Sequence, residues 1–298
     1  MPSNNGKINI NLIKSFCTLT PDANIILHFI FEEEHFKLKV DHFLSLISSG
    51  EIPCEIMPGV YREVTKRLFS AVKTYINICR FIKSWIKEHI KDPADIIINK
   101  DVLQFFEDAF SDLFSSHRRM GLRYRDIRIV EDALVNLLYR DVQGNVKISL
   151  EDFFRKAEDQ LSKKFRDFSY RQSIFASKIN ANILRETDIL PVTRTLETIL
   201  ENKCGIRDAE DRSQLGETIS RMYQTNRWYG FVSTDYTHII NHRREIEKYT
   251  QLIVDDPLYI LYHLDKAVNT CMHPRESATK RKIPYGEFVR FSSQPGIV

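Results

Sequence analysis

Acidic residues recur where the sequence predicts that strands end and helices begin. Asp22 and Asp235 each follow a predicted strand, and Glu63 lies about one and a half turns into the helix after another strand. A further acidic group, which includes Asp208 and Asp211, opens the helix that precedes the Asp235 strand. Because the carboxyl ends of parallel strands line the ligand crevice of an α/β sheet, we expect these carboxylates to share one pocket.

Carboxylates gathered in one crevice repel one another unless a cation offsets their charge. Mg²⁺ and Mn²⁺ prefer carboxylate and water oxygens, and such a site activates water and balances charge on a phosphoryl group. The pattern therefore predicts a Mg²⁺ or Mn²⁺ site suited to displacement at a phosphoryl group. The competing interpretation is that each acid only caps its helix, since acidic side chains favour helix N-termini.

Four short blocks of the sequence carry a family resemblance. They are PDANIIL (residues 21–27), MPGVYREV (57–64), AEDRSQLGE (209–217) and FVSTDYTHI (231–239). In this order, and at strand ends, the blocks resemble those of the PIN-domain nucleases. The resemblance implies a three-layer α/β core around a central parallel sheet, and a Mg²⁺- or Mn²⁺-dependent ribonuclease activity.

Carried over residue by residue, the resemblance implies catalytic, metal-binding carboxylates at Asp22, Glu63, Asp211 and Asp235. It also implies Asn24 as a supporting amide near the substrate, and Ser233 or Thr234 as hydroxyls near the metal.

The third acid has three candidates. Asp208 lies one turn before Asp211, and the stretch around Asp132 imitates the same block. We favour Asp211 because the apolar Leu215 follows it one turn later and the next strand comes soon after, whereas a long gap separates Asp132 from that strand. Asp208 is retained as a further metal ligand. Pro21 at the end of a buried strand and the open choice of third acid keep an alternative in place, a non-catalytic PIN-like module that binds RNA or protein.

A cluster of arginines between residues 117 and 128 is the strongest basic feature. Arg118, Arg119, Arg123 and Arg125 suit phosphate oxygens, and Tyr124 could stack on a base. We expect this region to grip RNA, single-stranded rather than duplex, beside the acidic crevice. The bland alternative is a solvated helical face with ion pairs along the helix.

Strands alternate with helices at both ends of the chain, and helices alone fill the middle. Predicted strands cover residues 13–19, 54–57, 229–233 and 250–254, and a long helix runs from Pro58 to about residue 90. This order predicts an α/β core with a parallel sheet, formed by residues 1–70 and 200–270. Residues 71–199 form a large all-helical insertion, and residues 271–298 a polar basic tail.

Composition narrows the class of protein. The formal charge of +3 is too small to indicate a polyanion partner by itself, and no apolar stretch is long enough to span a membrane. Five dispersed cysteines without a C-x-x-C pair, and no signal peptide, favour a cytoplasmic protein. Phosphate-loop, dinucleotide-binding and nucleophile-elbow motifs are absent from the sequence, and homo-oligomerisation stays open.

Overall fold

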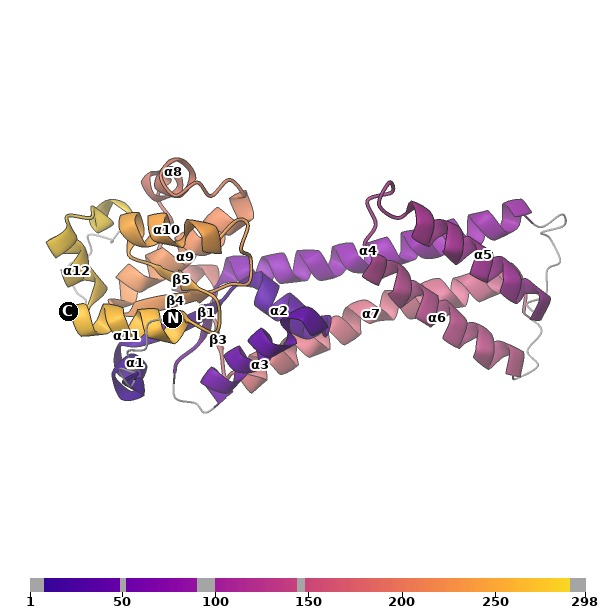
Figure 1. The fold of residues 1–298 in the computed structure, drawn as a ribbon, viewed down its shortest axis with the longest axis horizontal. Coiled ribbons are helices and arrows are strands. Elements are labelled where there is room, and N and C mark those ends of the chain that lie inside the picture. The colour runs from indigo at the N-terminus through magenta and orange to yellow at the C-terminus, as the bar shows by residue number, and fades with distance from the viewer. Residues whose placement is uncertain (1–7, 49–51, 90–99, 144–147, 290–298) are drawn as a thin grey trace. The chain divides into compact units, whose positions relative to one another are not determined.

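A computed structural model describes residues 8–48, 52–89, 100–143 and 148–289 (Figure 1). The strands are β1 (Cys17–Pro21), β2 (Glu55–Ile56), β3 (Asn182–Ile183), β4 (Trp228–Val232) and β5 (Ile253–Asp255). The helices are α1 (Ile10–Phe16), α2 (Ala23–Ile30), α3 (Glu34–Ser48), α4 (Pro58–His89), α5 (Lys100–Ser116), α6 (Tyr124–Gln143), α7 (Leu150–Lys178), α8 (Arg194–Asn202), α9 (Ala209–Thr225), α10 (Arg243–Thr250), α11 (Ile260–Thr270) and α12 (Pro274–Arg281). Three short 3₁₀ helices are η1 (Glu186–Asp188), η2 (Ile240–His242) and η3 (Tyr285–Glu287).

The chain divides into two compact units. Unit 1 comprises residues 1–65 and 171–298, and unit 2 comprises residues 66–170. All five strands belong to unit 1, and the named elements of unit 2 are helices. Unit 1 takes in residues 171–199, which the sequence assigned to the helical insertion, because β3 pairs with β2 and α8 packs on α9. None of the helices in the described ranges has the length and apolar character needed to cross a membrane.

The strands of unit 1 pair in parallel, as the alternation of strands and helices predicts. β4 lies between β1 and β5, and β2 pairs with β3. A parallel bridge from Leu19 to Cys54 connects the two groups, with the Leu19 amide donating to the Pro53 carbonyl at 2.9 Å. The carboxyl ends of β1, β4 and β5 therefore lie along one edge of the sheet.

Helices cover both faces of β4, and a glycine permits one of these contacts. A Cβ on Gly230 would come within 2.9 Å of Leu19 Cδ2 and of Leu264 Cδ1 in α11, so a larger residue would push α11 away. The neighbouring Tyr229 points to the other face, where its hydroxyl donates to Glu55 at 2.5 Å. Glu55 also receives Arg221 of α9, so α9 lies on the face opposite α11.

The first predicted strand is displaced in the structure. Residues 10–16 form α1, and the strand begins only at Cys17. Asn9 explains the helix, because its side chain caps Leu12 N at 3.2 Å while its own amide donates to Asp265 Oδ1 at 3.1 Å. The shift places Pro21 at the last position of β1, opposite Val232, so that its missing N–H interrupts no pair within the strand.

Residues 271–289, predicted as part of a polar basic tail, pack against unit 1. The Arg275 guanidinium donates to the carbonyls of Tyr223 and Gln224 at 2.7 and 3.0 Å, at the end of α9. Phe288 is fully buried, and Val289 forms a bridge with Val192. Carbonyls at a helix C-terminus have no partner within the helix, so the Arg275 contacts give this segment a fixed place.

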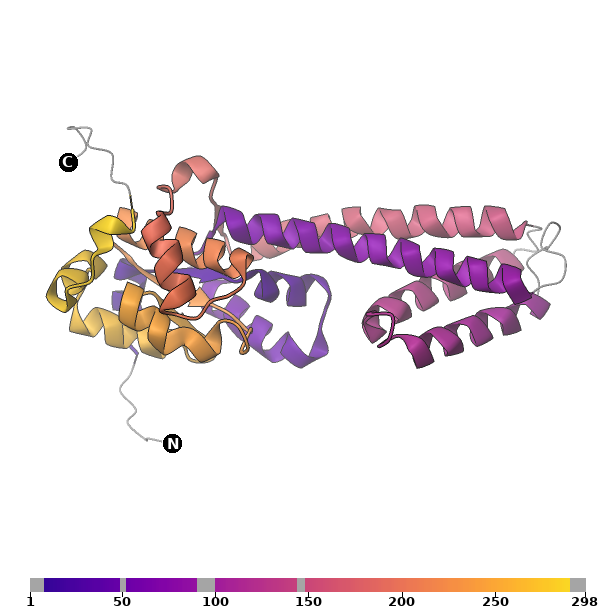
Figure 2. The ribbon, with the colours of Figure 1, turned by 90° about the horizontal axis from the view of Figure 1, so that it is seen from above.

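Unit 2 is built on two long helices that run side by side in opposite directions (Figure 2). The apolar spacing that predicted a helix from Pro58 is confirmed as far as His89. α7 is continuous to Lys178, whereas the sequence suggested a break near residue 169. A buried aromatic group of Phe106, Phe153 and Phe154 packs α5 on α7.

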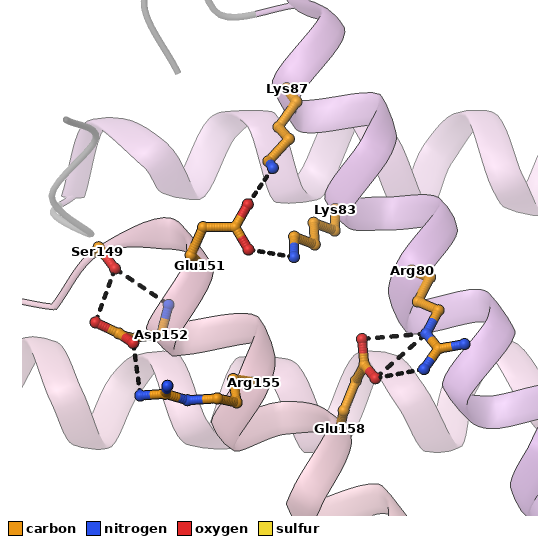
Figure 3. A network of polar contacts seen from close by, with 8 residues as sticks. All are labelled: Arg80, Lys83, Lys87, Ser149, Glu151, Asp152, Arg155 and Glu158. Atoms are coloured by element: carbon orange, nitrogen blue, oxygen red, sulfur yellow. Dashed lines mark hydrogen bonds and ion pairs between the residues drawn. The ribbon is translucent and has the colours of Figure 1, made fainter. Parts of the chain in front are cut away.

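Ion pairs connect α4 to α7 on the surface of unit 2 (Figure 3). Arg80 forms a forked pair with Glu158, and Glu151 accepts from both Lys83 and Lys87. Ser149 caps the start of α7, accepting from Asp152 N at 3.1 Å. These acids therefore each have basic or capping partners.

Candidate active site

Asp22 lies at the carboxyl end of β1 and begins α2 without capping it. Its backbone amide donates to the Val232 carbonyl at 2.8 Å and continues the pairing with β4. The carboxylate makes no cap bond to α2 and instead accepts from Ser233 Oγ at 2.7 Å and from Asn24 Nδ2 at 3.1 Å. Burial raises the pKa of Asp22 above its ordinary value, although the two hydrogen bonds act against this rise. Asp22 thus occupies the N-cap position of α2 while its carboxylate is engaged by Ser233 and Asn24.

Ser233 links Asp22 to Asp235 across the ends of two neighbouring strands. Its hydroxyl donates to Asp22 and also accepts from the backbone amide of Asp235 at 3.0 Å. Asp235 in turn accepts from His238, from the amide at 2.8 Å and from ring Nδ1 at 3.1 Å. One fully buried hydroxyl thus contacts the carboxylate of Asp22 and the backbone of Asp235, two residues predicted from the sequence.

Asp211 lies within the electrostatic field of the other acids. Burial and the negative charges of four other carboxylates together raise its pKa to about 7, the four being Asp22, Asp208, Glu63 and Asp235. Asp208 has a different local role, because it caps α9 by accepting from the amides of Glu210 and Asp211 at 2.7 and 3.1 Å. The third candidate, Asp132, is an exposed residue of α6 in unit 2.

Glu63 is held in the second turn of α4 by a residue that the sequence analysis missed. Its side chain is buried and accepts a short hydrogen bond from Gln214 Nε2 of α9. Glu217, one turn further along α9, accepts from the Gly59 amide at 2.7 Å and fixes the start of α4. A Cβ on Gly59 would come within 2.9 Å of the Glu217 carboxylate, which accounts for glycine at this position.

The donor set fits a hard divalent cation in its chemistry. It offers carboxylate and hydroxyl oxygens, the type of ligand that Mg²⁺ and Mn²⁺ prefer, and its acids raise the pKa of Asp211. Two buried oxygens, Thr20 Oγ1 and Gln214 Oε1, accept no hydrogen bond within the described ranges. Across those same ranges, no three His, Cys, Asp or Glu side chains converge closely enough to hold a metal ion. The acids therefore influence one another electrostatically, but within the described ranges they are not spaced as a coordination cage.

A histidine inside the apolar run of α2 also contacts the site. His28 stacks on Phe36 with ring centroids 3.8 Å apart, which fits a packing role. Its Nε2 lies 3.0 Å from Thr234 Oγ1 and its Nδ1 lies 2.5 Å from Glu33 Oε2. His28 therefore holds Thr234 next to Asp235, and Glu33 orients the ring. A histidine inside an apolar run was the available signal.

Two buried acids at the end of β5 were also missed. Asp255 and Asp256 are 2% and 1% exposed. Burial pushes the pKa of Asp255 upward, but hydrogen bonds from His263 and the Asp256 amide bring it below its ordinary value. Asp256 pairs with Lys39 at 2.6 Å and accepts from the Tyr236 hydroxyl at 2.5 Å. The available signal was the Asp-Asp-Pro sequence that follows a predicted strand.

The arginine cluster belongs to unit 2, between α5 and α6. Arg118, Arg119 and Arg123 are exposed, whereas Arg125 is partly buried beside Asp126. Tyr124 is engaged within the protein, since its hydroxyl accepts from Arg128 Nη2 at 2.8 Å and its ring lies 4.8 Å from that of Phe114. The predicted stacking of Tyr124 on a base would have to compete with these contacts.

Comparison with known proteins gives no relative. No family model matches the chain, and neither a curated protein nor a solved structure is similar enough to be aligned with it.

Proposed function

We propose that this protein is a Mg²⁺- or Mn²⁺-dependent phosphodiester hydrolase that cleaves RNA, with a PIN-like active site in unit 1. The observation that carries the proposal is the Ser233 hydroxyl, which joins Asp22 to the Asp235 amide beside the high-pKa Asp211. A cluster of buried like charges is costly to a fold, and such features persist at functional sites. The PIN-like sequence blocks supply the reaction class.

Each side chain has a role that follows from its contacts. Asp22, Asp211 and Asp235 would hold the cation, and Glu63 would hold either the cation or its water. When bound, the cation supplies water activation and offsets charge on the phosphoryl oxygens. Ser233 keeps Asp22 and Asp235 in register, and Gln214 keeps Glu63 turned toward α9. Asn24 and Thr234 flank the carboxylates, where a phosphate oxygen could accept from them.

The test is cleavage of a labelled single-stranded RNA in Mn²⁺ by the variants Asp22→Asn and Asp235→Asn. We expect both to lose activity to background while their circular dichroism stays unchanged, because each keeps its shape but loses the charge that binds the cation. The matched control is Asp159→Asn, an exposed acid of α7 paired with Lys163, which should cleave like the wild type. Full activity in either folded site variant would overturn the proposal.

A second candidate is a non-catalytic module that binds RNA or protein. It is favoured by the lack of a closed metal cage within the described residues. Calorimetric titration with Mn²⁺ separates the two candidates. Binding that Asp22→Asn abolishes favours the hydrolase, whereas absence of Mn²⁺ binding together with retained RNA binding favours the module.

A further inference from the structure

Two exposed tyrosines lie at the start of α11, near the edge of the sheet that holds the acids. Tyr259 and Tyr262 are 59% and 58% exposed, and Leu258 beside them is 41% exposed. Tyr259 is the N-cap residue of α11 and Tyr262 lies in its first turn, so the two exposed rings occupy neighbouring positions at the start of this helix. Large apolar side chains gathered at one place on a surface mark binding sites more often than chance exposure does.

The rings project from a rigid support. The amides of Tyr259 and Ile260 donate to the carbonyl of Asp256 at 3.0 and 3.1 Å, so the start of α11 is fixed to the end of β5. On the inner side, Leu264 and Val268 are buried against unit 1. Fixed aromatic side chains lose little conformational freedom on binding, which favours their use as a stacking surface.

A basic cavity adjoins the same helix. It has a volume of about 440 Å³, and its cationic lining comprises Lys266, Lys280 and Arg281. Glu247 is an acidic residue in its wall, and Lys280 is also paired with Glu276 at 2.7 Å. Because Lys266, Lys280 and Arg281 outnumber Glu247 in the lining, the cavity suits an anion, and Lys266 lies one turn beyond Tyr262 on α11.

We propose that single-stranded RNA binds along α11, with bases stacked on Tyr259 and Tyr262 and backbone phosphates held by Lys266 and Arg281. Aromatic rings interleaved with cations are the general means of binding single strands without sequence preference, because every base has a π-face and every nucleotide a charge. The site deepens the proposed function by naming the surface that delivers RNA to it. The end of β5 connects the two, since Asp256 binds the Tyr236 hydroxyl next to Asp235 and carries the start of α11.

The experiment is fluorescence anisotropy of a labelled oligouridylate with the full chain in EDTA, so that binding is measured without cleavage. We expect Tyr259→Ala/Tyr262→Ala to weaken binding by about tenfold or more, within the range known for lost base stacking. Tyr259→Phe/Tyr262→Phe should keep most of the affinity, because phenylalanine retains the stacking face. Lys266→Ala/Arg281→Ala should weaken binding and reduce its salt dependence. The matched control is Tyr139→Ala, a 56% exposed tyrosine of unit 2, which should bind like the wild type.

The outcomes separate this inference from the proposed function. Unchanged affinity in the folded alanine double variant overturns the α11 surface, whether or not the chain cleaves RNA. Loss of affinity in the phenylalanine variant equal to that in the alanine variant also overturns stacking. Tyrosine-dependent binding in a chain that cleaves nothing supports the α11 surface and counts against the hydrolase.

Discussion

The two units carry their charges in opposite ways. In unit 1, Asp22 and Glu63 are buried at the ends of secondary structure elements, and repulsion from acids of this pocket contributes to the raised pKa of Asp211. In unit 2, Glu151 accepts from Lys83 and Lys87, and these contacts hold its pKa down to about 2 (Figure 3). The paired acids on the surface of unit 2 are already balanced by their basic partners. The buried acids retain mutual repulsion that a bound cation would relieve, and this difference makes unit 1 the place to look for chemistry.

The largest expected effect on stability comes from an ion pair in unit 1. This pair is an exception to the contrast between the units, because its acid is balanced by a base. Arg221 forms a forked pair with Glu55 at 3.1 Å for both contacts, and the two side chains are 18% and 14% exposed. We expect Arg221→Ala to destabilise unit 1 by about 3 kcal/mol, because it leaves a buried carboxylate without its cation. Urea unfolding followed by the buried Trp228 of unit 1 measures this, in a Trp85→Phe background.

Arg155→Ala in unit 2 is the control for Arg221. Arg155 is 80% exposed and pairs with Asp152 at 2.6 Å on the same helix, so its loss should leave the unfolding midpoint nearly unchanged. Equal effects of the two substitutions would show that burial does not set the strength of these pairs.

The next effect concerns the pH dependence of Asp211. Its folded pKa of about 7 lies above the ordinary 3.8, so the folded state holds this proton more tightly than the unfolded state. The protonated carboxyl therefore makes its full contribution to folding stability below about pH 4. That contribution is lost as the pH rises to about 7. We expect Asp211→Asn to raise stability at about pH 8 by roughly 1 kcal/mol, well under the full electrostatic value because water screens a half-buried group.

The measurement is the free energy of unfolding between about pH 5 and 8. Glu210→Gln, the neighbouring acid of α9, is the matched control and should keep the wild-type profile. A profile for Asp211→Asn that parallels the wild type would mean that neither burial nor the neighbouring acids raise the pKa of Asp211. The two units would then not differ in how their acids affect stability.

Part of this organisation is readable from the sequence. The apolar spacing after Pro58 predicts α4 because a 3.6-residue period is maintained over many turns. Asp22 and Asp235 are predicted to meet because both follow strands of a parallel sheet, and the Ser233 hydroxyl does link them. The apolar period of a helix and the order of the strands along the chain can both be read from the sequence, and the structure preserves both.

Other features depend on contacts that no local sequence pattern predicts. The start of β1 is misjudged because the apolar residues of α1 run directly into it, and short apolar runs do not separate helix from strand. β3 has two residues and owes its existence to pairing with β2. Gln214 becomes a site residue only through its contact with Glu63, which is 151 positions away in the chain.

The smallest expected effect is on the stability of unit 2, and it tests the contrast with unit 1. The lowered pKa of Glu151 means that its ion pairs favour folding above its ordinary value of 4.5 and that this contribution is lost as the pH falls toward about 2. Glu151→Gln should cost less than about 1 kcal/mol near neutral pH, because the side chain is more than half exposed and solvent screens the charges. Added salt should shrink even this difference.

Unfolding followed by Trp85 in a Trp228→Phe background reports it, with the exposed Glu107→Gln in α5 as control. A loss of several kcal/mol would place Glu151 with Glu55 as a structural acid, and it would mean that unit 2 depends on its cross-helix pairs as unit 1 depends on Arg221.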